Sequence, residues 1–377
     1  MTMRIGLVGC GNISDIYLLN AALFRDITFT ACADINNEAA KRQASRYAIK
    51  AMTPKELFGS DEVDIVLNLT IPEAHAEISQ AALEAGKHVY GEKPLATNVA
   101  DGARLIETAR ARGLRVGCAP DTVLGASTQE ARRLIDADAI GRPLLGVASI
   151  MGHGMEHWHP NPGFFFRPGG GPVFDMGPYY LTTLVTLLGP VASIVALGQI
   201  GFKTRVISAP NSPLLGQSIK VETLTSAQAL LQFESGAQIT FLASWDVWNN
   251  SVPPIELYGE TGSMRVPDPN WFGGAIEKST RRGEWTAIGT EQQRFGQPNW
   301  PSDKPVHANY RGLGLAEMAR AITENRRHRA NGDVALHVLA IMAGILEAAT
   351  EGRPVKIAQG CEWPTALGEA EAEGLLV

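Results

Sequence analysis

The first 120 residues alternate short apolar runs with longer amphipathic stretches. The apolar runs are typical of buried strands: Ile5–Val8, Thr28–Ala33, Ile65–Leu69, His88–Tyr90 and Arg115–Cys118. The stretches between them have helical periodicity: Ile13–Phe24, Asn37–Tyr47, Ala74–Glu84 and Val99–Arg112. Because strands that alternate with helices form parallel βαβ units, the pattern predicts a doubly wound parallel sheet of the Rossmann type.

A different pattern begins after residue 140. Two pairs of strand candidates surround short turns that contain glycine, and each pair predicts a β-hairpin: Leu230–Phe233 with Gln238–Trp245, and Ile255–Tyr258 with Ser263–Val266. Local pairing of this kind implies a largely antiparallel open sheet. A stretch rich in proline and tryptophan, 267–305, predicts a folded loop, and helices are expected at Leu313–Asn325 and Val334–Ala349.

The length of 377 residues corresponds to about two domains at roughly 150 residues per domain. We expect a Rossmann domain over residues 1–122 and a substrate-binding and oligomerisation α/β domain over 123–377. Hydrophobic residues make up 45% of the chain and charged residues 19%, which excludes a disordered or fibrous protein. The net charge of −6 gives no electrostatic reason to expect nucleic acid or an anionic membrane as a partner.

The cysteines are too widely spaced for a metal-binding pair or a disulfide framework; they are Cys10, Cys32, Cys118 and Cys361. The first residues lack the pattern of a signal peptide. Leu181–Phe202 carries no charge and is long enough to span a bilayer, but Gly189-Pro190 divides it. A core helix, a turn and a buried strand fit this segment better. We therefore expect a cytoplasmic protein without a membrane partner.

A glycine turn follows the first predicted strand. Residues 9–14 read Gly-Cys-Gly-Asn-Ile-Ser, so Gly9 allows a tight turn and Gly11, with Asn12 and Ile13, lets the main chain approach a pyrophosphate. Ser14 replaces the third glycine of the dinucleotide motif, and the alternative is an ordinary glycine turn. Asp34 ends the second strand, where an acid can hold the ribose hydroxyls and repel a 2′-phosphate, so NAD is favoured. Lys41 and Arg42 leave NADP open.

Further motifs follow in order: Asn-Leu-Thr-Ile-Pro at 68–72, Gly-Glu-Lys-Pro at 91–94 and Gly-Gly-Gly-Pro-Val-Phe-Asp-Met-Gly at 169–177. With the glycine turn, they make the chain similar to the Gfo/Idh/MocA family of NAD(P)-dependent oxidoreductases along nearly its whole length. The resemblance implies hydride transfer between a nicotinamide and a carbinol carbon of a sugar, cyclitol or related polyol. It also places Asn68, Thr70, His75, Glu92 and Lys93 at the cofactor.

The resemblance identifies Lys93 with the family's catalytic lysine and Asp175 with the aspartate of its Asp-x-Gly-x-His motif. Tyr179 stands where the family has the histidine, which is a real departure. Pro178 fits the first turn of a helix, which places Asp175 near the helix N-terminus. If that turn is helical, Asp175 and Tyr179 share one face. A neighbouring Lys93 ammonium would favour ionisation of the phenol, so Tyr179 is a candidate acid/base. The alternative is that Tyr179 only lines the pocket and Lys93 works with Asp175 or a nearby histidine.

Residues 151–167 supply candidates for that histidine and for substrate contacts. His153, Glu156, His157 and His159 match no metal spacing, so we expect no metal. A substrate loop is the favoured interpretation, in which Trp158 stacks on the substrate while His157 or His159 binds its hydroxyls. The remaining substrate candidates are Arg167, at a position where the resemblance implies an arginine, and Asp121 and Thr122, after the last Rossmann strand. His337, on the late helix, is expected to be a packing residue.

Two other functions stay open at this point. One is an NAD-dependent glycosidase that oxidises, eliminates and reduces again, and the other is a non-catalytic ligand sensor, which the missing histidine favours. The resemblance also implies a homodimer or homotetramer formed through the outer face of the second sheet, where strands 230–245 alternate polar and apolar residues.

Overall fold

The structure is a computed structural model that describes residues 2–299 and 307–377. The N-terminal part is a six-stranded parallel sheet with strand order β3-β2-β1-β4-β5-β6. Its strands are β1 (Met3–Val8), β2 (Ile27–Ala33), β3 (Lys50–Met52), β4 (Ile65–Asn68), β5 (His88–Gly91) and β6 (Val116–Cys118). Its helices are α1 (Ser14–Asn20), α2 (Asn37–Tyr47), α3 (Pro54–Gly59), α4 (Pro72–Glu84) and α5 (Val99–Ala111). The predicted doubly wound sheet is confirmed.

One strand and one helix of this N-terminal part were not predicted. Strand β3 has only three residues, two of them exposed, so it lacks an apolar run. Helix α3 begins with a capping box in which the Thr53 hydroxyl accepts from the Glu56 amide, and Pro54 stands in its first turn. That sequence signal was present, since Thr-Pro-x-Glu combines two features of helix starts.

The second sheet has nine strands in the order β16-β15-β14-β13-β7-β12-β11-β8-β17, and all its neighbours are antiparallel except β7 and β12. The strands are β7 (Pro143–Met151), β8 (Val191–Gln199), β11 (Ser226–Phe233), β12 (Gln238–Ser244), β13 (Ile255–Gly259), β14 (Gly262–Val266), β15 (Ile276–Thr280), β16 (Thr286–Ile288) and β17 (Val355–Lys356). Both predicted hairpins, β11–β12 and β13–β14, are present.

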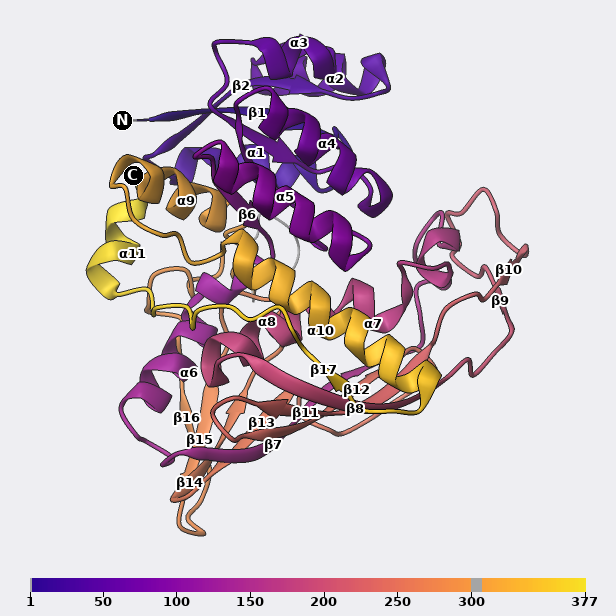
Figure 1. Ribbon diagram of the computed structural model, residues 1–377, viewed down its shortest axis with the longest axis vertical. Coiled ribbons are helices and arrows are strands. Elements are labelled where there is room, and N and C mark those ends of the chain that lie inside the picture. Colours follow the sequence, from indigo (N-terminus) through magenta and orange to yellow (C-terminus); the bar gives the residue numbers. More distant parts are fainter. Residues whose placement is uncertain (1, 300–306) are drawn as a thin grey trace.

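The remaining strands form a small separate pair, β9 (Thr204–Val206) and β10 (Ser218–Lys220), which extends from one end of the large sheet (Figure 1). The loop predicted over 267–305 contains β15 and β16, while Trp300 and the residues up to 306 lie outside the described part of the chain.

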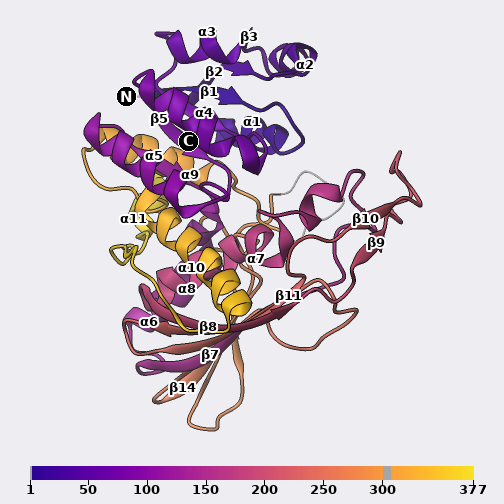
Figure 2. The ribbon, with the colours of Figure 1, turned by 45° about the vertical axis from the view of Figure 1, so that its right-hand side comes forward.

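Helices cover one face of the large sheet and lie between it and the parallel sheet (Figures 1 and 2). They are α6 (Ala126–Asp136), α7 (Gly171–Asp175), α8 (Gly177–Leu188) and α10 (Gly332–Glu351). The expected core helix is confirmed by α8, which is buried throughout. The strand that follows, β8, is not buried as expected, because alternate residues such as Leu197 face away from the helices. By length and composition α10 could cross a membrane, but 61% of its most apolar window is buried, and it packs on α8, α5 and β8.

The end of the chain returns to the parallel sheet. Leu315 and Met318 of α9 (Leu313–Thr323) share a buried cluster with Leu7 of β1 and Leu67 of β4. Helix α11 (Glu369–Leu375) follows, and its last residue, Leu375, joins the same cluster. The predicted boundary assigned all residues after 122 to the second domain. Helices α9 and α11 lie after that boundary, yet they pack on the first sheet.

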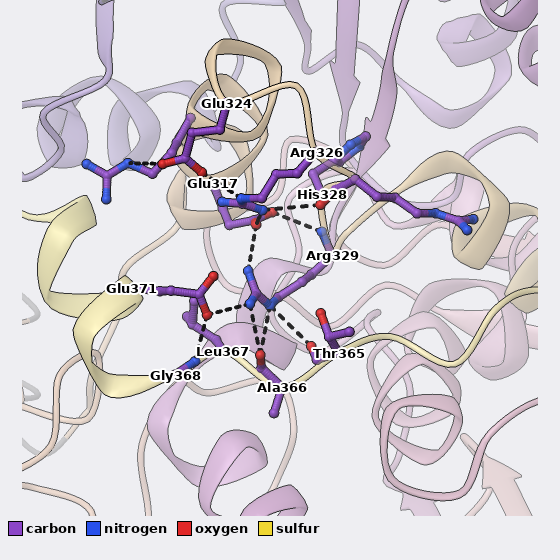
Figure 3. Close-up of polar contacts among 12 residues, drawn as sticks. Glu317, Glu324, Arg326, His328, Arg329, Thr365, Ala366, Leu367, Gly368 and Glu371 are labelled. Carbon is purple, nitrogen blue, oxygen red and sulfur yellow. Dashed lines mark hydrogen bonds and ion pairs between the residues drawn. The ribbon is translucent and has the colours of Figure 1, made fainter.

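A buried ion network fastens this C-terminal segment (Figure 3). Glu317 of α9 is fully buried and accepts from Nη1 of Arg326 at 2.6 Å and Nη1 of Arg329 at 2.8 Å. Arg329 also donates to Glu371 of α11 and to the Ala366 carbonyl. Because a buried carboxylate is costly without paired donors, this network holds α9, α11 and the segment between them in one arrangement.

Candidate active site

The glycine turn lies at the carboxyl edge of the parallel sheet, between β1 and α1. Gly9 has a φ of +100°, and a Cβ at this position would lie 2.6 Å from the main-chain carbon and oxygen of Leu69. Its amide donates to the Ala33 carbonyl at 2.9 Å, which ties the turn to β2. Conformation and packing therefore both require glycine at position 9.

Gly11 has a different reason to be glycine. A Cβ there would meet no described atom within 4 Å, and Gly11, Asn12 and Ile13 are all exposed. Ser14 is fully buried, and its hydroxyl donates to the Gly11 carbonyl at 2.6 Å and accepts from Gln43. A small polar residue therefore fits the third motif position, while the surface over Gly11 stays open for a pyrophosphate to approach.

Asp34 closes the other side of this turn at the end of β2. Its carboxylate accepts from the amides of Cys10 and Asn36, both at 2.7 Å. Exposed isoleucines, Ile13, Ile35 and Ile71, follow β1, β2 and β4 and form an apolar rim at the same edge. Open glycine backbone, a carboxylate at the second strand and an apolar rim fit the pyrophosphate, ribose and adenine of a dinucleotide.

Two residues expected at the cofactor, Asn68 and His75, use their side chains within the protein. Asn68 donates to the His75 carbonyl and to Ser79 and accepts from the amide and hydroxyl of Thr70. The ring nitrogens of His75 lie 2.7 Å from the Pro94 carbonyl and 3.0 Å from that of Thr70. The side chains of Asn68 and His75 thus position the main chain at this edge, which leaves a direct cofactor contact to the main chain and to the half-buried Thr70.

Lys93 follows β5 and forms the centre of the site. Its Nζ donates to Oδ1 of Asp175 at 2.9 Å and to the Asp175 carbonyl at 2.7 Å. Burial opposes the ammonium charge, but Asp175, Tyr179 and Glu92 outweigh it and raise the pKa of Lys93 above its usual value. Glu92 also accepts from the Lys93 amide and from the Tyr17 hydroxyl, so the turn that carries Lys93 is held from both sides.

Tyr179 lies in the first turn of α8, which Pro178 begins as expected. Its side chain is buried, and Nζ of Lys93 lies 5.3 Å from the centre of its ring. The expectation that Asp175 and Tyr179 share one helix is wrong, because the helix is interrupted at Met176 between α7 and α8. Both side chains nevertheless meet at Lys93.

Arg311 is a site residue that sequence reasoning missed. Its guanidinium donates to the amide oxygens of Asn309 and Asn270, both at 3.1 Å. Burial opposes its charge, but the nearby Tyr179 and Glu92 raise the pKa of Arg311 above its usual value. Neutral amides hold this guanidinium directly, and its charge acts on Tyr179 as well as on the carboxylates of Glu92 and Asp121. The available sequence signal was its place just before the helix expected from Leu313.

Asp121 and Thr122, expected to bind substrate, are buried instead. Oδ2 of Asp121 accepts from the amides of Gly312 at 2.8 Å and Gly314 at 3.2 Å, and burial raises the pKa of Asp121 to about 6. This carboxylate therefore fixes the main chain directly after Arg311, where α9 begins. Its role is to position Arg311, which corrects the predicted substrate contact.

The segment 151–167 divides between two regions. His159 packs edge-on against Phe164 and Phe165, burial lowers its pKa, and Asp175 is close enough to oppose that shift. Phe164, Phe165, Lys93 and Asp175 line a cavity of about 40 Å³. His159 thus packs against the two phenylalanines that line the Lys93 cavity, and the exposed Trp158 packs against its edge.

His157 and Arg167 lie elsewhere. His157 is exposed and lines a separate cavity with His153, and Arg167 is exposed near Glu222. Neither residue lines the cavity beside Lys93, so their substrate contacts stay a prediction. His337 is buried and accepts from the Val191 amide at 2.9 Å, as expected of a packing residue. Within residues 2–299 and 307–377, no group of three His, Cys, Asp or Glu side chains could hold a metal ion.

The group around Lys93 can manage a hydroxyl proton. A protonated lysine can donate to a substrate oxygen, a phenol can exchange a proton with it, and an aspartate and an arginine hold the two in place. Because the group lies at the carboxyl ends of the parallel strands, beside the dinucleotide turn, its geometry suits redox chemistry at a carbinol carbon.

Two family models match this chain. The model described as the oxidoreductase family with an NAD-binding Rossmann fold matches residues 3–119, and the GFO/IDH/MocA C-terminal domain model matches residues 128–265. Inositol 2-dehydrogenase 3 of Saccharopolyspora erythraea is 31% identical over 275 residues, which cover 71% of this chain and 74% of the relative. A dTDP-3,4-didehydro-2,6-dideoxy-alpha-D-glucose 3-reductase of Streptomyces violaceoruber is 31% identical over 269 residues, 70% of this chain and 72% of that protein.

Solved structures share the fold at lower identity. The apo form of levoglucosan dehydrogenase matches with a TM-score of 0.80 at 20% identity, over 96% of this chain and 100% of that chain. An aldose-aldose oxidoreductase from Caulobacter crescentus, complexed with glycerol, matches with a TM-score of 0.75 at 22% identity, over 94% and 100%. The two domain models, the dehydrogenase relative and these folds agree, and the chain therefore belongs to the Gfo/Idh/MocA family of oxidoreductases, whose first domain is an NAD-binding Rossmann fold.

Proposed function

We propose that this oxidoreductase is an NAD-dependent dehydrogenase that oxidises a secondary hydroxyl of a cyclitol, a sugar or a related polyol. The observation that carries the proposal is the partly buried ion pair of Lys93 and Asp175 beside Tyr179. The inositol and sugar chemistry named for relatives agrees with this substrate class. A nicotinamide ring, when bound, supplies the hydride acceptor or donor.

The proposed proton chemistry uses the chain's own residues. Lys93 donates from its Nζ to the substrate oxygen and so orients the carbinol. Tyr179, as phenolate, accepts the hydroxyl proton, and the positive charge of Arg311 stabilises the phenolate. Asp175 keeps Lys93 in place from a different domain. The tyrosine thereby takes the acid/base part for which the family motif has a histidine.

NAD is the proposed cofactor in preference to NADP. Asp34 places a carboxylate at the end of β2, and the next residue is the fully exposed Ile35, which offers no charge to a 2′-phosphate. Lys41, one of the two cations that left NADP open, pairs with Glu38 at 2.9 Å. We therefore propose that the Asp34 carboxylate decides the preference for NAD over NADP.

Substrate entry requires some rearrangement. The cavity beside Lys93 measures about 40 Å³, room for only a few water molecules, and a sugar is much larger. Phe164 and Phe165 form its outer wall from the loop between β7 and α7. We infer that this loop moves when a substrate binds.

The direct test is a substrate panel. The protein, freed of small molecules, is assayed with NAD and with NADP against myo-inositol, other cyclitols, aldoses and alditols, following absorbance of the reduced cofactor. We expect NAD-dependent oxidation of at least one member. NAD binding without turnover of any member would favour a sensor, whereas cleavage of a glycoside with no net change in cofactor would favour the glycosidase.

We further propose that the chain forms a homodimer or homotetramer in the cytoplasm. One face of the nine-stranded sheet has no helix over it (Figure 2), and it exposes Leu145, Val195, Leu197 and Leu230. An apolar face of this kind is typical of an interface. The cytoplasmic location is supported by the four cysteines, which are free thiols, as is usual in a reducing compartment. Leu197→Glu should shift the mass measured by light scattering toward the monomer, and an unchanged mass would exclude this face.

A further inference from the structure

A second cavity lies away from Lys93, between the end of the nine-stranded sheet and the β9–β10 pair. It measures about 360 Å³, and its lining residues include His153, Glu156, Phe202, Arg205 and Trp248. It shares no lining residue with the cavity beside Lys93. The Phe165, Phe166 and Trp245 rings pack against one another nearby, and Phe165 is itself part of the wall of the Lys93 cavity.

Arg205 is the polar centre of this second cavity. Its side chain is 4% exposed and donates to Glu156 at 2.8 Å, to Asp246 at 2.5 Å and to the Trp245 carbonyl at 2.9 Å. Asp246 in turn accepts from the hydroxyls of Thr225 and Ser226. A buried guanidinium held between two carboxylates is a fixed, desolvated ion network and differs from a solvated ion pair on the surface.

Three buried polar atoms of this group have no hydrogen-bond partner among the described residues: Nε of Arg205, Oε2 of Glu156 and Nδ1 of His153. Nε2 of His153 lies 3.5 Å from Nη1 of Arg205, so it faces a donor and can only accept. Burial, with Arg205, lowers the pKa of His153 and favours the neutral ring, whose proton is then on Nδ1. The group therefore offers two unused donors and one unused acceptor.

The charges restrict what can bind there. Arg205 balances only one of the two carboxylates, so the site carries net negative charge and disfavours an anion. A metal ion is disfavoured as well, because the guanidinium occupies the space between Glu156 and Asp246. A neutral group that both donates and accepts hydrogen bonds, such as a hydroxyl, matches the unused atoms.

The wall of the cavity is aromatic. The indole of Trp248 is 80% exposed and stacks on the His153 ring, with 3.3 Å between ring centres and 15° between planes. Phe202 is 47% exposed and packs over the Arg205 guanidinium. Exposed aromatic faces beside unpaired hydrogen-bonding atoms suit a molecule with C–H faces and hydroxyl edges.

We propose that this cavity is a second binding site, separate from the catalytic group, for a small neutral polyhydroxylated molecule such as a sugar or a cyclitol. Hydroxyls of the ligand bind Arg205, Glu156 and His153, and its ring packs on Trp248. The proposal goes beyond the dehydrogenase activity and does not depend on it.

The test uses the whole chain and saturation-transfer NMR with myo-inositol, D-glucose and D-xylose as probes. Lys93→Met removes the main hydroxyl donor of the catalytic cavity and isolates the second site. We expect at least one probe to bind Lys93→Met and to bind at least about 10-fold more weakly once Trp248→Ala is added. Phe202→Ala should act in the same direction, and Trp285→Ala, between β15 and β16, is the matched tryptophan control.

Two results would overturn the second site: no probe binds, or every probe binds equally well with and without Trp248→Ala or Phe202→Ala. Thermal melting must show that the variants are folded. Trp248 is exposed, so its removal leaves the core intact. If the wild-type protein oxidises no polyol but binding still depends on Trp248, the proposed activity fails and the second site stands.

Discussion

Nζ of Lys93 lies 2.9 Å from Oδ1 of Asp175, so an ion pair joins the turn after the fifth parallel strand to the helix that leads into α8. The two residues are 82 positions apart, and their side chains are 16% and 18% exposed. Partial burial strengthens this contact compared with a surface pair. The geometry makes the charge of Lys93 depend on the second domain.

Asp175→Asn should change the pH dependence of catalysis. In the wild type, Asp175, Tyr179 and Glu92 raise the pKa of Lys93 despite burial, so the ammonium persists at high pH. Without the Asp175 charge, burial lowers that pKa, and we expect kcat/KM to fall above about pH 9, where the wild type holds its rate. The measurement is kcat/KM against pH, with Asp333→Asn, a surface partner of Arg110, as control. Parallel profiles would show that Asp175 does not control Lys93.

Arg311→Gln should show whether the charge of Arg311 supports proton transfer at Tyr179. Glutamine keeps donors toward Asn309 and Asn270 but removes the positive charge beside the phenol. If that charge stabilises the phenolate, kcat at neutral pH falls about 10- to 100-fold while the Kd of the substrate changes little. Arg294→Gln, at an exposed arginine paired with Glu373, is the control. A kcat equal to that of the control would remove Arg311 from this role.

Asp34→Asn should weaken the choice of NAD over NADP. The carboxylate holds the Cys10 and Asn36 amides, and an asparagine oxygen can still accept from one of them while the negative charge is lost. We expect the ratio of kcat/KM for NAD to that for NADP to fall about 10-fold or more. The check is initial rates with both cofactors, since a constant ratio would mean that another residue discriminates.

Asp121→Asn should flatten the pH dependence of stability. Burial raises the pKa of Asp121 to about 6 in the folded chain, against an ordinary value near 4 in the unfolded chain. The folded state therefore binds the proton more tightly, and the free energy of unfolding falls as pH rises from about 4 to about 6, by up to about 3 kcal/mol from this group. Urea unfolding at pH 4.5 and 7 measures the difference. An equal change in both proteins would contradict the assignment.

The parallel sheet and the hairpins could be predicted because their signals are local. Val66 and Leu67 lie in a fully buried strand, and the β11–β12 hairpin surrounds a short glycine turn. The same logic missed β3, whose residues are mostly exposed. It also could not show that α9 covers the parallel sheet, because that packing joins residues about 300 positions apart, such as Leu7 and Leu315.

The candidate site was predictable only where a motif carries it. Lys93, Asp175 and Gly9 come from motifs, and the structure places each where the motif implies. Arg311 and Asp121 depend on contacts across the fold, since Asp121 holds amides some 190 residues later. Sequence alone marked Asp121 as a polar residue at the ligand edge, but burial turned it into a positioning residue for Arg311.

Tyr179→Phe tests the central claim most directly, because it removes one oxygen and leaves a ring that packs as before. The measurement combines kcat on a substrate found by the panel with the Kd values of NAD and of that substrate. If Tyr179 exchanges the hydroxyl proton, kcat falls about 100- to 10,000-fold while both Kd values stay within about 2-fold. A kcat close to that of the wild type would contradict the account and return the acid/base part to Lys93 or His159.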